Sequence, residues 1–249
     1  QILAQYYGKE AIMLDVPNEL SQESLSYVSG QLRELTGKLE EVTGQRLDPD
    51  RLRACIRYSN QARTLYMRLA QLARGKPFPW DGMRAFVLSI AGNVFAGTPF
   101  QAELYQRLIT EIEERIASAR VRPEKYRILW LAWCPVLPTV IPDVLRQHQA
   151  SIVMSEMAWD WWDEIDEDRP YEGMALRCLK NPYVGPITQR LSGIMKLAEV
   201  YDVDGVVHFS SQACRHANAS FRVIQDALAK RGIPLLVLEG DMSDQRNYS

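Results

Sequence analysis

The sequence predicts an α/β protein, in which a helical segment is followed by a Rossmann-like domain with a parallel four-stranded sheet. Helical patterns dominate up to about residue 123, and beyond it short apolar runs of strand length alternate with helical patterns. Near-continuous apolar runs are typical of parallel strands, which are buried on both faces by the helices that connect them. We therefore expect a remnant of an upstream α/β domain (1–20), a helical segment (21–123) and a C-terminal α/β domain (124–249).

Helical patterns with starting and stopping residues at their ends cover four stretches of the first half, namely 17–44, 47–75, 80–97 and 98–120. Ser21, Asp48 and Thr98 are the expected N-caps, because their side-chain oxygens can accept hydrogen bonds from the first free amides of a helix. One isolated run, Ala11–Pro17, is predicted to be a strand whose sheet partners would lie upstream of the first residue.

Strands and helices alternate in the second half of the chain. The apolar runs that predict strands are 126–133, 150–156, 203–210 and 233–241. The helical patterns between them are 137–149, 187–202 and 215–232. A long stretch, residues 157–186, is expected to be irregular.

Composition narrows the function. The 249 residues carry a formal net charge of −2, so the basic surface of a nucleic-acid-binding protein is not expected. No apolar run reaches the roughly 18 residues of a membrane span, and no signal-peptide pattern opens the chain. The four cysteines lie too far apart for a zinc knuckle. We predict a cytoplasmic protein that binds neither nucleic acid nor membranes.

Ligands of open parallel sheets bind beyond the carboxyl ends of the strands. Residues that follow the four predicted strands are therefore expected at one rim: Cys134; Ser155 and Glu156; Ser210, Ser211, Gln212 and Cys214; Glu239 and Asp241. Cys214 also opens a predicted helix, where free amides favour an anion, and Arg215 adds positive charge beside it. A nucleophilic cysteine and a metal-binding cysteine both need the thiolate form. The alternative is that Cys214 is a small hydrophobic residue buried under the loop.

A nucleophilic Cys214 would need a base, and His208 and His216 flank it in the sequence. Neither a GxGxxG nor a GxxxxGK[ST] motif occurs, so dinucleotide and P-loop sites are not predicted. Cys55 and Cys178 fall within helical patterns and are expected to be core residues.

Residues 203–249 resemble the C-terminal part of the subunits of the benzoyl-CoA reductase / 2-hydroxyacyl-CoA (2-hydroxyglutaryl-CoA) dehydratase family. The shared pattern is a strand, a loop cysteine followed by a basic residue, a helix, "GIP" before a strand, then "EGD" and "RNYS". Cys214 and Arg215 occupy the loop positions. The stretches "YYGKEAIMLDVP" and "LEEVTGQRLDPDRLRACIRYSNQAR" also resemble central segments of the family.

The resemblance implies an iron–sulfur subunit that takes low-potential electrons from an ATP-dependent iron–sulfur activator. With a second subunit as its dimer partner, such an enzyme dehydrates or reduces an acyl-CoA thioester by a radical mechanism. Cys214 corresponds to one of three ligands of a [4Fe-4S] cluster, with Arg215 beside it, and the other two ligands would precede Gln1. "CPVLP" resembles a ligand-bearing pattern of some members, which makes Cys134 a further candidate.

Hydrogen bonds to cluster sulfur or to the thioester oxygen are predicted from three polar residues before the cysteine: Ser210, Ser211 and Gln212. Without the upstream cysteines, the 249 residues alone are expected to be inactive and free of a cluster. Two other interpretations stay open. One is a non-catalytic partner subunit without a working cluster, and the other is a cysteine hydrolase that uses Cys214 and His208.

Overall fold

The computed structural model describes residues 2–80, 82, 90, 92–135, 139–158, 163–212, 214–241, 244 and 246. The chain forms two compact units, and each is continuous in space but not in sequence. The first comprises Gln1–Arg57 and Trp161–Pro186, and the second comprises Tyr58–Asp160 and Ile187–Ser249.

The first unit is helical. Its elements are α1 (Ile2–Tyr7), α2 (Gln22–Thr43), the beginning of α3 (Pro49–Leu72) and α7 (Pro170–Lys180). As predicted, Ser21 caps α2, since its hydroxyl accepts from the Ser24 amide at 3.0 Å. Gly44 ends the same helix with a φ of 67°, a conformation that glycine adopts without steric cost. Val28 of α2 and Ala175 and Leu179 of α7 form the unit's core.

Two predictions for this unit are wrong. Ala11–Pro17 is extended but is not a strand, and at Asp15 a side-chain amide, that of Gln31, bonds the backbone where a neighbouring strand would. The Gln31 amide accepts from the Asp15 N–H and donates to the Asp15 carbonyl, both at 2.8 Å. The stretch 157–186 contains helix α7, whose Cys178 packs against the core as expected for that cysteine.

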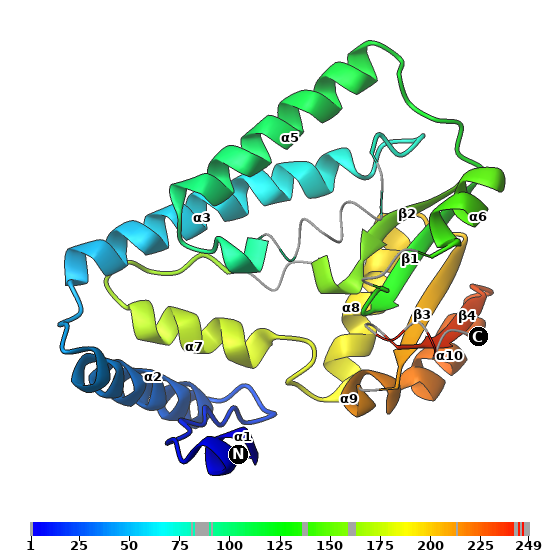
Figure 1. Ribbon diagram of the computed structural model, residues 1–249. Helices are drawn as coiled ribbons and strands as arrows, with labels where there is room; N and C mark the ends of the chain where they lie inside the picture. The colour runs from blue at the N-terminus through cyan, green and yellow to red at the C-terminus, as the bar shows by residue number, and fades with distance from the viewer. Residues whose placement is uncertain are drawn as a thin grey trace. The chain divides into compact units, whose positions relative to one another are not determined.

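The second unit is built on a four-stranded, all-parallel sheet in the order β2-β1-β3-β4 (Figure 1). The strands are β1 (Tyr126–Ala132), β2 (Ala150–Ser155), β3 (Gly205–Ser211) and β4 (Leu235–Gly240). The predicted fold class, an α/β protein with a Rossmann-like parallel sheet, is confirmed. The four strands lie within one to two residues of their predicted ranges.

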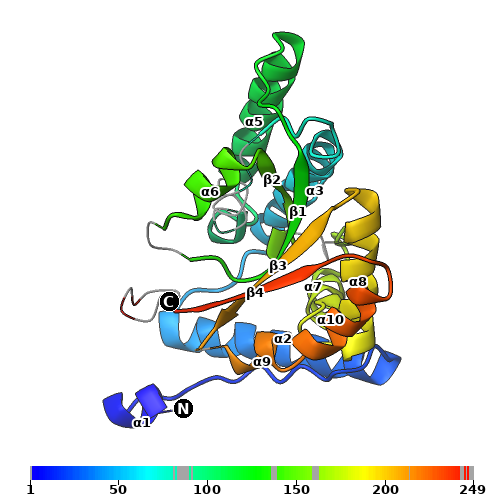
Figure 2. The same cartoon turned by 90° about the vertical axis from the view of Figure 1, so that its right-hand side faces the viewer.

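Helices cover both faces of this sheet, as Figure 2 shows. On one face lies α6 (Ile141–Gln147), whose Ile141 and Leu145 pack on a cluster that includes Trp130 and Phe209. The opposite face carries α8 (Ile187–Val200) and α10 (Phe221–Ala229), with side chains of both helices in one core cluster. Successive residues of a strand face opposite sides of the sheet, and helices cover both sides. The strand sequences are therefore apolar almost throughout.

The remaining helices differ from their predicted forms in detail. The predicted helix 215–232 is interrupted at 219–220, which leaves the single-turn α9 (Arg215–Asn218) ahead of α10. The predicted helix 137–149 is shorter, and it begins at Ile141. Helix α5 (Pro99–Ala117) follows Thr98 as expected, but the Thr98 hydroxyl does not cap it and instead donates to the Phe95 carbonyl at 2.7 Å. Half of the predicted helix at 80–97 falls outside the described residues.

A buried ion pair lies at the amino end of the sheet. Arg127 at the start of β1 binds Glu124, and only 5% of each side chain is exposed. The Arg127 guanidinium also donates to the carbonyls of Tyr201 at 2.8 Å and Gly75 at 3.1 Å. These bonds tie the segment after α3 and the end of α8 to the sheet.

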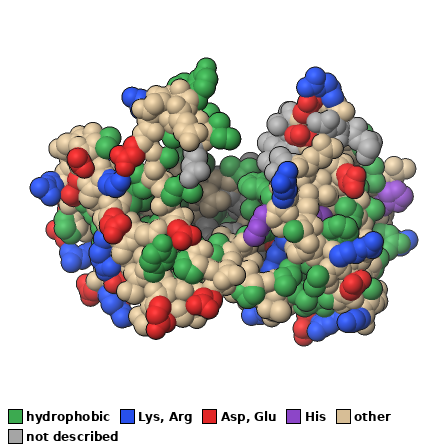
Figure 3. All heavy atoms as spheres, turned by 90° about the horizontal axis from the view of Figure 1, so that it is seen from below, with side chains coloured by type: hydrophobic (Ala, Val, Ile, Leu, Met, Phe, Trp, Pro, Cys, Tyr) green, Lys and Arg blue, Asp and Glu red, His purple; other side chains and the backbone are tan. Residues whose placement is uncertain are grey.

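Lys and Arg side chains alternate with Asp and Glu side chains on the face shown in Figure 3, without a field of one sign. This mixture agrees with the formal net charge of −2. Among the described helices, none combines the length and the apolar character that crossing a membrane requires.

Candidate functional site

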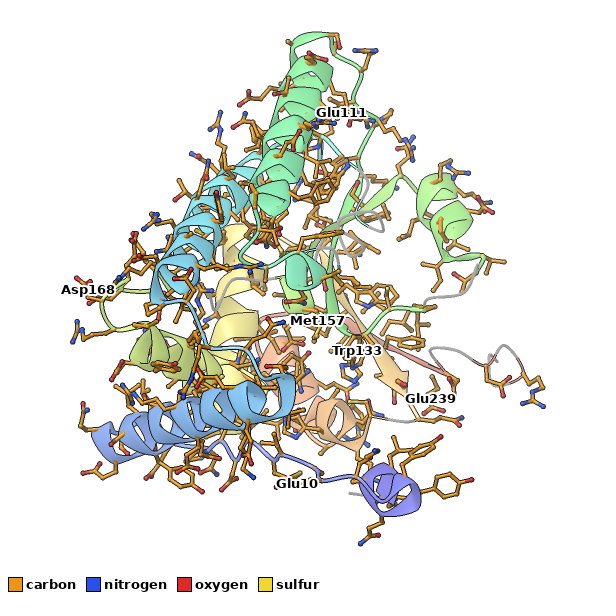
Figure 4. All side chains as sticks on the ribbon, turned by 60° about the vertical axis from the view of Figure 1, so that its left-hand side comes forward. Glu10, Glu111, Trp133, Met157, Asp168 and Glu239 are labelled. Carbon is orange, nitrogen blue, oxygen red and sulfur yellow. The ribbon has the colours of Figure 1, made fainter. Side chains whose placement is uncertain are left out.

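The strand order places the carboxyl ends of β1 and β3 side by side. Between these two strands the connections of the sheet change direction. The connection from β1 leads outward to β2 on one side, and β3 and β4 lie on the other side. Such a switch point is where open α/β sheets bind their ligands. Cys134 follows β1 and Cys214 follows β3, so the turns that carry these cysteines flank the switch point. In Figure 4, Trp133 and Met157 mark the turns after β1 and β2, and Glu239 marks the end of β4.

Cys134 is buried, in a cluster with Trp130, Ile152 and Phe209. Burial raises the pKa of its thiol to about 12, so the free thiol is neutral at physiological pH. The turn itself is fixed by the indole of Trp130, which donates to the Trp133 carbonyl at 2.7 Å. Cys134 therefore has the environment of a core residue, and a metal would have to displace its proton.

Cys214 is half-buried and occupies the N-cap position of α9. Its amide donates to the Ser211 carbonyl at 3.0 Å, and its carbonyl accepts from the Asn218 amide at 3.3 Å. The Asn218 side chain adds a second bond, from Nδ2 to the Ser211 carbonyl at 2.8 Å. The predicted long helix behind Cys214 is a single turn, which ends before α10 begins.

The other predicted site residues lie around this turn. Ser210 and Ser211 are the last two residues of β3 rather than the first of the loop. Successive strand residues face opposite sides of a sheet, so only Ser211 shares the face of Phe209 and Cys134. Ser211 is buried and its hydroxyl has no hydrogen-bond partner among the described residues. Gln212 and Arg215 are exposed.

His208 lies in the middle of β3 with none of its surface exposed. Its ring stacks on Phe221, and the Asn218 side chain is the polar group beside its ring nitrogens, although no hydrogen bond of good geometry joins the two among the described residues. A cysteine nucleophile needs its base within hydrogen-bond reach. The geometry therefore gives no support to a catalytic pair of Cys214 and His208.

The burial of His208 predicts a pH-dependent stability. Burial lowers the pKa of the His208 imidazole, so His208 is neutral in the folded protein. In the unfolded chain the same imidazole titrates at about 6.5. Below that pH the unfolded state binds the extra proton, and stability falls as the pH falls. We expect urea unfolding to show that His208→Leu loses less stability than wild type between pH 7 and pH 5.

The matched control is His148→Gln, because His148 is exposed at the end of α6. This variant should keep the acid sensitivity of the wild type. Equal acid sensitivity in His208→Leu and wild type would contradict the buried, neutral state of His208.

Beneath the two cysteine turns lies an ion pair that the sequence analysis missed. Arg190 of α8 donates to Glu156 twice, from Nε to Oε1 at 2.7 Å and from Nη2 to Oε2 at 3.0 Å. Only 4% of each side chain is exposed. Glu156 follows β2 and was expected at the rim without a role. Arg190 shares the buried stripe of α8 with Ile194, Leu197 and Ala198, so an arginine on an apolar helix face was the available signal.

The described residues contain no group of three or more His, Cys, Asp or Glu side chains that could hold a metal ion. The four cysteines are free thiols. With Cys134 held neutral by burial, the described part of the chain does not complete the three-cysteine set that the resemblance implies. Cys214 is the thiol at the switch point with partial exposure.

Comparison with known proteins gives a consistent result. The family described as 2-hydroxyglutaryl-CoA dehydratase, D-component, matches residues 1–249. The chain is 25% identical to the (R)-phenyllactyl-CoA dehydratase alpha subunit of Clostridium sporogenes, over 96% of this chain and 60% of that protein. It is 23% identical to the alpha subunit of (R)-2-hydroxyglutaryl-CoA dehydratase of Acidaminococcus fermentans, over 99% of this chain and 53% of that protein.

A third relative is a benzoyl-CoA reductase subunit of Thauera aromatica, which is 24% identical over 100% of this chain and 63% of its own length. The chain therefore spans less than two thirds of the length of these relatives. The resemblance that residues 203–249 indicated is confirmed, and it extends over the whole chain.

Proposed function

Since the chain belongs to the 2-hydroxyglutaryl-CoA dehydratase D-component family, we propose that it is part of an enzyme subunit that acts on an acyl-CoA thioester. The observation that carries the proposal is the family match over residues 1–249. The position of Cys214 supports it, because the turn after β3 lies at the switch point where a parallel sheet binds its ligand. The reaction is the dehydration of a 2-hydroxyacyl-CoA or the reduction of an aromatic acyl-CoA.

The finer proposal is an iron–sulfur subunit in which Cys214 provides one ligand of a [4Fe-4S] cluster. When bound, such a cluster would deliver single electrons of low potential to the thioester. Because the described residues do not complete a ligand set, the remaining ligands come from outside them, with Cys134 as the further candidate within this chain. Arg215 adds positive charge beside the Cys214 thiolate. Ser210, Ser211 and Gln212 are the candidates for hydrogen bonds to sulfur or to the thioester oxygen.

The proposed partners follow from the same reaction. A radical reduction of a thioester needs a strong reductant, and we assign that role to a separate ATP-dependent iron–sulfur activator. A second dehydratase or reductase subunit would form a dimer with this one and close the substrate site. We place the protein in the cytoplasm, where free thiols such as its four cysteines persist.

The test is the iron and acid-labile sulfide content of the full-length natural protein, purified without oxygen. We expect about four irons per chain, the content of one [4Fe-4S] cluster. Dehydration or reduction of acyl-CoA substrates should then require the partner subunit, the activator and ATP. Absence of iron, with activity that still requires this chain, would replace the proposal by the non-catalytic partner subunit. Thioester hydrolysis in air without iron would replace it by the cysteine hydrolase.

A further inference from the structure

We propose that the buried Glu156–Arg190 ion pair is a positioning device that couples the Cys134 turn to the Cys214 turn. The Cys134 turn is defined as residues 132–135, and the Cys214 turn as the described residues of 211–218. The coupling is a property of the folded chain, and only its use for holding a cluster rests on the proposed function.

Glu156 reaches the Cys134 turn through the backbone. Its Oε2 accepts from the amide of Ala132, the last residue of β1, at 3.2 Å. Ala132 has a φ of 61°, a left-handed conformation that is unfavourable for residues other than glycine. Such a conformation persists where the surroundings hold it in place, and it turns the chain sharply from β1 toward Cys134. The carboxylate thus supports the strained residue from which the Cys134 turn begins.

Arg190 reaches the other turn. Its Nη1 donates to the Ala217 carbonyl at 3.1 Å and to the Ser220 hydroxyl at 2.6 Å. Ala217 lies in the last part of α9, a helix too short to be stable by itself, and Ser220 lies between α9 and α10. Asn218 lies between them and closes the turn through its bonds to Ser211 and Cys214. The guanidinium therefore fixes the end of the single helical turn that Cys214 opens.

The two halves meet in one planar contact. Both carboxylate oxygens of Glu156 are engaged by Arg190, and this bidentate geometry restricts the orientation of both groups. A displacement of the Ala132 amide would move the carboxylate, and the guanidinium would follow toward or away from α9. A pair of apolar side chains would fill the same space but would fix neither turn, because it offers no directional bonds.

The test measures the alkylation of each cysteine by iodoacetamide in the metal-free chain, with peptide mass spectrometry to assign the rates. In the wild type, Cys134 should react slowest because it is buried. We expect Glu156→Gln and Arg190→Met each to raise the rates of both Cys134 and Cys214 by about tenfold, since local opening exposes thiols without global unfolding. Cys55 is the internal reference, as it belongs to the first unit whereas the ion pair belongs to the second.

The matched control is Arg127→Met. The Arg127–Glu124 pair is buried to the same degree but lies at the amino end of the sheet. The Arg127→Met variant should leave the alkylation rates of Cys134 and Cys214 unchanged, although it removes a similar ion pair. If Arg127→Met raised these rates as much as Arg190→Met did, the effect would be general destabilisation and the proposal would fail.

Two further outcomes overturn the coupling. In one, Glu156→Gln affects Cys134 alone and Arg190→Met affects Cys214 alone. In the other, none of the rates changes. Should Arg190→Met fail to fold, Ser220→Ala removes one of the arginine's acceptors, and it should raise the Cys214 rate about threefold. Because alkylation needs no iron, a protein that never binds a cluster can still confirm or refute the coupling.

Discussion

Arg190→Met is expected to lower the free energy of unfolding by about 3–5 kcal/mol, because it leaves the Glu156 carboxylate buried without its counter-ion. The same substitution removes the donors to the Ala217 carbonyl and the Ser220 hydroxyl. Urea unfolding, followed by the fluorescence of the tryptophans, measures this loss. Glu156→Leu should cost a similar amount because it leaves the guanidinium without a partner.

The double variant Glu156→Leu/Arg190→Met should lose less than the sum of the two single losses, since no unpaired charge remains in it. Interaction energies of residues in direct contact reach about 3 kcal/mol in such cycles. Some loss should persist, because the Ala132 amide loses the Glu156 carboxylate and the Ala217 carbonyl loses the Arg190 guanidinium. Strict additivity of the single losses would show that the two side chains do not act as one unit.

The sheet could be predicted from the sequence because each strand is an apolar run that ends at polar or turn-forming residues. Burial on both faces requires such runs, and the alternation with helical patterns favours parallel pairing. The order of the strands in the sheet could not be predicted in this way. It depends on which strands pair across the sheet, and the periodicity of a single strand does not encode its neighbours.

The errors have local causes. Ala11–Pro17 has the composition of a strand, but the backbone of its Asp15 is bonded by the side-chain amide of Gln31, 16 residues away. The helix predicted from residue 215 onward divides at 219–220, where the Ser220 hydroxyl accepts from Arg190. In both places a distant polar side chain decides the local structure, and no short-range pattern reveals it.

The candidate site, like the fold, could be predicted only in part. The rule that ligands bind beyond strand ends selected Cys134, Cys214 and Glu156. It did not distinguish the buried, neutral Cys134 from the half-exposed Cys214, because burial depends on the packing of Trp130 and Phe209 from two strands. Arg190 was missed because it comes from α8, and its contacts to the ends of β2 and α9 exist only in the folded chain.

Cys214→Ser is expected to remove most of the iron from the full-length protein, and with it the acyl-CoA activity. A serine hydroxyl at this position keeps the size of the side chain but ionises far less readily than a thiol, so it is a poor ligand for iron. Because Cys214 is half-exposed, the free energy of unfolding of the metal-free chain should change by less than about 1 kcal/mol. Iron and sulfide analysis of protein purified without oxygen gives the direct measurement.

Two cysteine variants complete this experiment. Cys55→Ser is the matched control, since Cys55 is also half-exposed but lies on α3, and it should keep its iron. Cys134→Ala addresses the second candidate ligand. Burial opposes ionisation of the Cys134 thiol, so we expect this variant to lose less iron than Cys214→Ser. Full iron content in Cys214→Ser would remove Cys214 from the ligand set, whereas equal losses in the two site variants would assign both turns of the switch point to the cluster.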